Sequence, residues 1–229
     1  MSLFSSRSTR ASSTERPVAE RYQHPDVVGA YDRVRYQTVG GRFNNWRTHQ
    51  ILRKILAGLP PGGLVFDVAC GTGRIDACLL QARQRVVALD ISGEMLAVAQ
   101  EKPELRSPAL RFVRSDASRL PCRARSADAV FSIRFLHLLK GHERIAVLQE
   151  LARVTRGPVV VEYRSLTKPL RVAKRALVRW VTRRPGPRNI ARSDVGAELH
   201  AAGLVAERHY FLSRWFSGSV LIVARVRAT

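Results

Sequence analysis

The stretch Val65-Phe66-Asp67-Val68-Ala69-Cys70-Gly71-Thr72-Gly73-Arg74 is an apolar run that ends in a glycine-rich turn. Gly71 and Gly73 allow the backbone to take positive φ values and to approach a bound molecule closely. Their amides come just before a segment with helical spacing over 75–84, so they lie at the N-terminus of a helix. Because ligands of open parallel sheets bind at the carboxyl ends of the strands, the stretch predicts a ligand site at this edge.

The charges around the turn indicate which end of a ligand it holds. The carboxylate of Asp67 suits a cationic group, such as an amino-acid ammonium, better than a pyrophosphate. A dinucleotide-binding turn has the spacing Gly-x-Gly-x-x-Gly, and Asp76 stands here in place of the third glycine. An anion at that position would face the diphosphate or the helix N-terminus. The pattern therefore disfavours a dinucleotide-dependent dehydrogenase.

Apolar runs alternate with helical patterns along the rest of the chain. This alternation is typical of a parallel sheet with helices on both faces, which places the protein in the α/β class. The last two strands are joined by a short loop, and we expect them to pair antiparallel. Strands are predicted over 65–68, 86–89, 111–114, 129–133, 159–162, 206–212 and 219–226, and helices over 46–59, 75–84, 94–101, 143–154 and 194–202.

Two further carboxylates end the second and third predicted strands. Asp90 follows the glycine turn by about 20 positions, where an acid accepts both hydroxyls of a ribose. Asp116 ends the third strand, where a carboxylate can accept a hydrogen bond from an adenine amino group. A single aspartate at a strand end is more often a helix cap or a turn former. Three acids at three adjacent strand ends, together with the glycine turn, indicate a nucleoside site.

The sequence resembles the class I S-adenosylmethionine-dependent methyltransferases, and within them the ubiquinone/menaquinone-biosynthesis and small-molecule type. The resemblance is specific to the superfamily and says little about the substrate. The matching stretches are DVACGTGR (67–74), LDISGEML (89–96), SDASRLP (115–121), ADAVFSIRFLHLL (127–139) and ELARVTRGPVVVEY (150–163).

This resemblance implies a Rossmann-like doubly wound sheet of seven strands. The implied strand order is 3-2-1-4-5-7-6, with strand 7 antiparallel and a helical lid at the N-terminus. We expect residues 1–24 to be a disordered polar tail and residues 25–229 to form a single methyltransferase domain. A basic amphipathic insertion is expected within it, over 164–192.

The resemblance also implies S-adenosylmethionine as the cofactor and S-adenosylhomocysteine (SAH) as the product. Asp90 would hold the ribose, and Ile91 and Met95 would pack near the adenine or simply belong to the core. The full set of implied cofactor-binding residues is Asp67, Gly71 and Gly73 at the methionine end, Asp90, Ile91, Met95, and Asp116 with Ala117 at the adenine edge.

The candidate catalytic residues follow the fourth strand. A general base is needed only if the methyl acceptor carries a proton, and His137 is the best placed candidate. Related families often have a histidine pair here, but this chain has Leu138 in the second position, so His137 can equally be structural. Arg134 would steer an anionic substrate or be a solvated arginine. Tyr31 and Tyr36 would close over the cofactor as a lid, or pack within their segment.

The chain has 39 basic and 18 acidic residues, which gives a net charge of +21. Residues 164–192 carry ten of the basic residues and no acidic residue. Residues 166–184 read as a basic amphipathic helix with Trp180 on its apolar side, a pattern typical of a membrane interface. The same arginines would suit RNA phosphates, although aromatic residues are sparse and no RNA-binding module is recognisable. The helix can also simply pack its apolar stripe on the domain.

These patterns predict an enzyme that methylates a small molecule, with a lipid-linked or quinone-like acceptor favoured at an anionic membrane surface. The alternatives are an RNA methyltransferase and a non-catalytic protein that binds the cofactor. Three cysteines without a Cys-x-x-Cys pair fit a reducing compartment, so we expect the protein in the cytoplasm, peripheral to the inner membrane face. The histidines lack the spacing of metal ligands, and we expect no metal.

Overall fold

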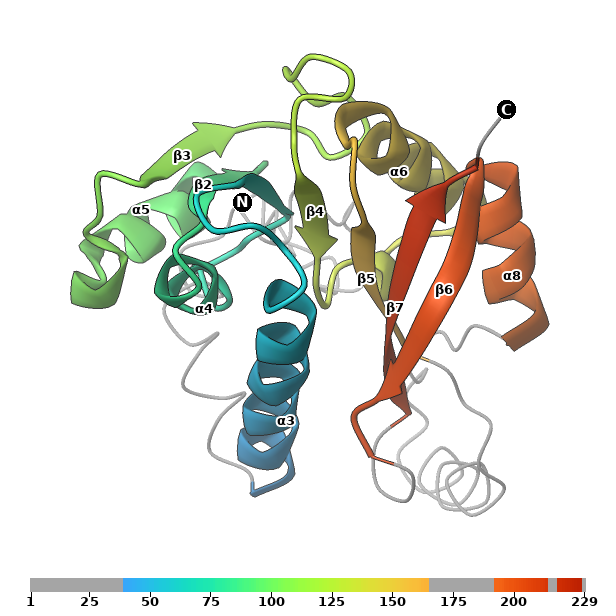
Figure 1. Cartoon of the computed structure of the whole chain (residues 1–229), viewed down its shortest axis with the longest axis horizontal. Coiled ribbons are helices and arrows are strands. Elements are labelled where there is room, and N and C mark those ends of the chain that lie inside the picture. The colour runs from blue at the N-terminus through green and yellow to red at the C-terminus, as the bar shows by residue number, and fades with distance from the viewer. Residues whose placement is uncertain (1–38, 165–191, 214–217, 228–229) are drawn as a thin grey trace, which may run out of the picture.

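A computed structural model of the chain describes residues 39–164, 192–213 and 218–227. It contains a seven-stranded sheet with helices on both faces, and the strand order is β3-β2-β1-β4-β5-β7-β6 (Figure 1). Strands β1 to β5 pair in parallel. Strand β7 lies antiparallel between β5 and β6. The predicted fold class, the strand order and the antiparallel seventh strand are confirmed.

The elements follow the predicted sequence of strands and helices with small shifts at their ends. The strands are β1 (Leu64–Val68), β2 (Arg85–Asp90), β3 (Leu110–Arg114), β4 (Ala129–Ser132), β5 (Val159–Arg164), β6 (Leu204–Phe211) and β7 (Ser219–Val226). The helices are α3 (Val39–Leu56), α4 (Asp76–Gln81), α5 (Gly93–Glu101), α6 (Gly141–Val154) and α8 (Arg192–Ala201), with short 3-10 turns η1 (Pro103–Leu105) and η2 (Leu136–Leu138).

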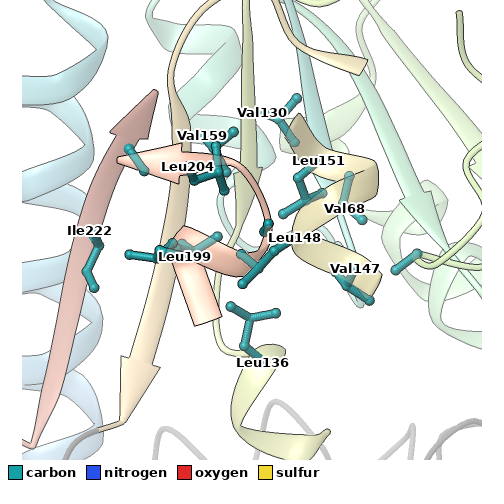
Figure 2. Close-up of a cluster of buried hydrophobic side chains, with 14 of the residues drawn as sticks. Val68, Val130, Leu136, Val147, Leu148, Leu151, Val159, Leu199, Leu204 and Ile222 are labelled. Atoms are coloured by element: carbon teal, nitrogen blue, oxygen red, sulfur yellow. The ribbon is translucent and has the colours of Figure 1, made fainter. Parts of the chain in front are cut away.

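Two buried clusters hold the helices to the sheet. On one face, Leu148 and Leu151 of α6 and Leu199 of α8 pack against Val130 and Val159 of the central strands (Figure 2). On the other face, α3, α4 and α5 cover a second cluster of buried residues. Burial of apolar area on both faces of the sheet is what requires the near-continuous apolar runs of β1, β4 and β5.

Helix α3 begins at Val39, seven residues before the position that the sequence predicts. The predicted start was wrong because the apolar spacing begins only near Ile51, whereas the helix also includes Gly40 and Gly41. The second half of α3 is fixed by Ile51, Leu52 and their neighbours, which are buried against the sheet. Packing of this apolar face outweighs the weak helix propensity of the glycines at its start.

Several predicted features fall outside the described residues. These are the polar tail over 1–24, Tyr31 and Tyr36 of the predicted lid, and the basic insertion except for its ends. Within the described part of the chain, none of the helices combines the length and the apolar character needed to cross a membrane.

Candidate cofactor site

The site lies where the glycine turn after β1 meets the end of β2. The amide of Cys70 donates to the carbonyl of Leu89 at 3.1 Å, which continues the β1–β2 pairing into the turn. The amide of Gly71 donates to Oδ2 of Asp90 at 2.7 Å. The other carboxylate oxygen of Asp90 accepts from the amide of Ser92 at 2.9 Å. Asp90 therefore fixes both the glycine turn and the turn that leads into α5.

Asp90 is 8% exposed. Burial raises the pKa of its carboxyl above the usual value, while the bonds from the Ser92 and Gly71 amides favour the ionised form and act against this rise. Backbone bonds from Ser92, Gly71 and Ile91 use part of the acceptor capacity of the two oxygens, and the remaining lone pairs can accept from further donors. This arrangement is compatible with the predicted bonds to ribose hydroxyls.

The glycine turn contains three alternate positions in the left-handed region, Ala69, Gly71 and Gly73, with φ values of 60°, 57° and 73°. A Cβ atom at Gly71 would meet no atom within 4 Å, so the backbone here faces open space. A Cβ at Gly73 would lie 2.4 Å from Cδ1 of Leu105, so this glycine permits close packing against η1. Gly71 is therefore the position at which a ligand can approach the backbone.

Two carboxyl groups meet beneath the turn. Asp67 near the end of β1 is 2% exposed, and Asp76 in the first turn of α4 is fully buried. The two side chains face each other, and among the described residues no donor reaches either carboxylate oxygen of Asp76. Burial and then the nearby charge of Asp76 raise the pKa of Asp67 well above its usual value. Burial raises the pKa of Asp76 to about 6.

The residues predicted at the adenine edge line the ends of β2 and β3. Met95 and Ala117 are buried, Ile91 is half-buried, and Asp116 is exposed. The Oδ1 atom of Asp116 accepts from the amide and the hydroxyl of Ser118, at 2.8 and 2.9 Å. Asp116 thus shapes its own turn, which is the common role of a strand-end aspartate. Its contact with adenine stays a prediction.

The residues that follow β4 and β5 form the neighbouring part of the edge. Arg134 has a φ of +63°, which is uncommon for a residue with a side chain. Its Nε lies 4.0 Å from Oε2 of Glu162, and the two side chains are 17% and 2% exposed. His137 is buried within η2, beside β5. Arg134 is therefore a paired, largely buried arginine and not a solvated one.

A buried ion pair fixes the elements behind His137. Arg144 of α6 donates through Nε to both carboxylate oxygens of Glu198 in α8, at 3.0 and 2.9 Å. The hydroxyl of Tyr163 in β5 donates to Glu198 at 3.0 Å, and Nη1 of Arg144 donates to the carbonyl of Leu139 at 2.7 Å. The network connects α6, α8 and β5 to the end of η2, and so positions the segment that carries His137.

The first half of α3 extends past the edge at which β4 and β5 end (Figure 1). Nη2 of Arg74, in the glycine turn, donates to Oδ1 of Asn45 at 2.6 Å and joins the turn to this helix. Phe43 and Trp46 lie on the exposed side of the helix, 42% and 54% exposed. Their ring centroids are 5.8 Å apart. An exposed aromatic pair thus lies on the helix that adjoins the turn.

Residues 65–157 match the protein family described as a methyltransferase domain. The demethylmenaquinone methyltransferase of Renibacterium salmoninarum is 36% identical over 155 residues, which are 67% of this chain and 62% of that protein. A tRNA (carboxymethyluridine(34)-5-O)-methyltransferase of Xenopus tropicalis is 36% identical over 130 residues, which are 53% of this chain and 18% of that protein. The chain spans less than two thirds of the length of either relative.

Among solved structures, the magnesium protoporphyrin IX methyltransferase of Synechocystis PCC 6803 with bound SAH superposes with a TM-score of 0.72. The sequence identity is 21%, and the match covers 89% of this chain and 98% of that one. Fold, glycine turn, strand-end carboxylates and family match together define a class I S-adenosylmethionine-dependent methyltransferase. Residues 65–157 of the chain form a methyltransferase domain of this class.

The chemistry of the site fits the cofactor of this class. S-adenosylmethionine has a cationic amino end, a ribose with two hydroxyls, and an adenine. The buried carboxyls of Asp67 and Asp76 fit a cation, and the open space at Gly71 leaves room for the ligand beside the turn. Asp90 offers acceptors for hydroxyls. Among the described residues, no group of three or more metal-ligating side chains is present.

Two site residues were missed from the sequence. Asp76 was considered only as the replacement for a third glycine, and its contact with Asp67 depends on the angle at which α4 leaves the turn. Glu162 was counted as part of an apolar strand, although it is a carboxylate near the end of β5. The signal that identified Asp90 and Asp116, an acid at a strand end, also applies to Glu162.

Proposed function

We propose that the protein transfers a methyl group from S-adenosylmethionine to a small-molecule acceptor, lipid-linked or quinone-like, at a membrane surface. The observation that carries the transfer reaction is the glycine turn held by Asp90 beside the buried carboxyl of Asp67. The similarity to demethylmenaquinone methyltransferases supports an acceptor of the quinone type.

Methyl transfer depends mainly on the alignment of two reactants, and holding them in place supplies several kcal/mol. S-adenosylmethionine supplies a methyl group on a positively charged sulfur, which is open to attack by a nucleophile. Asp67 would hold the amino end and Asp90 the ribose. The Arg134–Glu162 pair would orient the acceptor, since Arg134 follows β4, the strand that pairs with β1. His137 would take up the proton of an acceptor hydroxyl or amine.

The surface near the site supports an acceptor that is reached from a membrane. Phe43 and Trp46 are exposed on α3, and the flanking residue Arg42 is also exposed. Aromatic and basic side chains of this kind favour the boundary between lipid headgroups and acyl chains. The ten basic residues of 164–192 would add attraction to anionic lipid, each worth about 1 kcal/mol at best.

RNA is the second candidate acceptor, because one relative is a tRNA methyltransferase. The similarity covers 18% of that protein, so it concerns the methyltransferase domain and leaves the rest of that protein without a counterpart. The same arginines that would face anionic lipid would contact phosphates in this case.

The test is transfer of labelled methyl from S-adenosylmethionine into a fractionated extract of the source cell, with the Asp90→Ala variant run in parallel. Label in the organic phase, reduced with Asp90→Ala, supports the proposal. Label in RNA would identify RNA, and not a lipid-like molecule, as the acceptor. Label only in water-soluble small molecules would contradict the membrane location. Absence of label, with cofactor binding intact, would identify a protein that binds the cofactor without turnover.

A further inference from the structure

Asp76 is a buried carboxyl for which the fold provides no hydrogen-bond donor. It is fully buried, and among the described residues no donor reaches either Oδ1 or Oδ2. Its side chain contacts that of Asp67 from β1, which is 2% exposed. Two carboxyls in such contact can form a hydrogen bond only when one of them carries a proton, because two carboxylates have no donor between them.

The charged and titratable groups facing this pair come from three other elements. Asp90, from the end of β2, adds a further negative charge. Lys102, after the end of α5, is a cation that favours the ionised form of Asp76, and its Nζ donates to the carbonyl of Thr72 at 2.7 Å. Burial, and then the charge of Asp76, raise the pKa of the Cys70 thiol, so this thiol stays neutral.

The balance of these groups favours one proton on the pair near neutral pH. Burial is the largest cause, and it raises the pKa of both carboxyls, that of Asp76 to about 6 and that of Asp67 well above its usual value. Among the described residues, Lys102 is the cation that acts on Asp76, and it faces the two carboxyls of the pair and a third at Asp90. The protons of such a coupled pair belong to the pair and not to one residue.

We propose that Asp76 is a positioning residue that keeps a proton on the Asp67–Asp76 pair of the cofactor-free protein, and that cofactor binding releases this proton. The cationic amino end of the cofactor would bind beside Asp67. The O–H bond of the pair then breaks, the proton passes to the solvent, and the ammonium compensates the added negative charge. The proposal rests on the cofactor class and not on the identity of the methyl acceptor.

The linkage has a direct consequence for affinity. If one proton leaves on binding, the association constant of SAH rises with pH, with a slope approaching tenfold per pH unit below the titration of the pair. A nucleoside without the amino-acid end, such as 5′-methylthioadenosine, has no ammonium to replace the proton. Its association constant should therefore not follow this slope.

The decisive experiment is calorimetric titration of SAH into the full chain at pH 6.5, in two buffers that differ in ionisation enthalpy. The difference between the two measured heats gives the number of protons released per SAH bound. We expect close to one proton for the unmodified protein and for Glu101→Gln, which changes an exposed carboxyl of α5. We expect almost none for Asp76→Asn, because the asparagine amide donates to an ionised Asp67.

Equal proton release by Asp76→Asn and the unmodified protein would overturn the proposal, as would the absence of release by the unmodified protein. If Asp76 had a purely structural role, Asp76→Asn would change the affinity for SAH but not the number of protons released per SAH bound. If Asp76→Asn does not fold, the pH profiles of SAH and 5′-methylthioadenosine on the unmodified protein decide: parallel profiles overturn the proposal. Failure of the unmodified protein to bind SAH at all would instead contradict the cofactor assignment, on which the proposal depends.

Discussion

At the scale of single residues, Asp90 stabilises the site before any ligand is present. Its two carboxylate oxygens accept the amides of Gly71 and Ser92, so that the turns after β1 and β2 are fixed to each other. The residue was predicted as a ribose acceptor, and the sequence gives no sign of these amide bonds. A substitution at Asp90 will therefore change both the shape of the turn and its contacts with the cofactor.

Gly71 allows a separate test of the space beside the turn. Gly71→Ala places a Cβ where no atom lies within 4 Å, at a φ of +57°. We expect the backbone strain to lower the free energy of unfolding by about 1 kcal/mol. We expect SAH affinity to fall at least tenfold, because the added methyl enters the space assigned to the cofactor.

The matched control for this variant is Gly203→Ala. Gly203 has a φ of +72° and also meets no atom within 4 Å, but it follows α8, away from the glycine turn. We expect Gly203→Ala to lose about as much stability as Gly71→Ala and to keep the affinity of the unmodified protein for SAH. Equal affinities of the two variants, measured by titration alongside urea unfolding, would show that the cofactor does not occupy the space at Gly71.

The buried carboxyl pair predicts a pH dependence of stability. Asp76 binds a proton more tightly in the folded protein, since its pKa is raised from 3.8 to about 6. The folded state therefore holds more protons than the unfolded state in this window, and the contribution of Asp76 to stability falls as the pH rises through it. Because asparagine does not titrate, the stability of Asp76→Asn does not fall with pH for this reason.

We expect the free energy of unfolding of Asp76→Asn, relative to the unmodified protein, to increase by about 2 kcal/mol between pH 4 and pH 7. Urea unfolding at several pH values in the absence of cofactor measures this difference. A difference that stays constant over the range would mean that Asp76 titrates normally in the folded protein.

At the scale of elements, the Arg144–Glu198–Tyr163 network joins α6, α8 and β5 around one buried carboxylate. Truncation of Glu198 to alanine leaves the guanidinium of Arg144 buried without its counter-charge, at a cost of about 3–5 kcal/mol. Tyr163→Phe removes one neutral donor, and Glu198 keeps its bonds to Arg144, so we expect a loss of about 1 kcal/mol.

The comparison of these two variants by urea unfolding distinguishes a network centred on the ion pair from simple packing. Similar losses for Glu198→Ala and Tyr163→Phe would contradict the central role of the ion pair. The network also supports the η2 segment through the carbonyl of Leu139. We therefore expect variants that keep the network intact also to keep His137 in place.

The sequence predicted the strands well and the helix ends less well. Strand β7 was predicted at its observed bounds, because its apolar run begins directly after a short loop. The start of α3 was missed, since burial of Ile51 and Leu52 stabilises a helix that its first residues do not favour. Asp76 was not recognised as a partner of Asp67, because contacts between a strand and the following helix depend on packing that spacing alone does not define.

At the scale of the whole molecule, the parallel order of β3, β2, β1 and β4 brings residues from distant segments to one edge. Asp67, Asp90 and Asp116 are separated along the chain, yet all three follow or end adjacent strands. This is why strand-end residues could be predicted as a site from the sequence. The acceptor could not be predicted in the same way, since segment 164–192 matches none of the motifs that define the class.

We expect S-adenosylmethionine and SAH to bind at this edge of the sheet. The most direct test is titration of SAH into the unmodified protein, Asp90→Ala and Glu101→Gln, with folding checked by circular dichroism. We predict that the unmodified protein and Glu101→Gln bind SAH alike, and that Asp90→Ala binds at least tenfold more weakly. Equal binding by a folded Asp90→Ala variant would contradict binding of the cofactor at this edge.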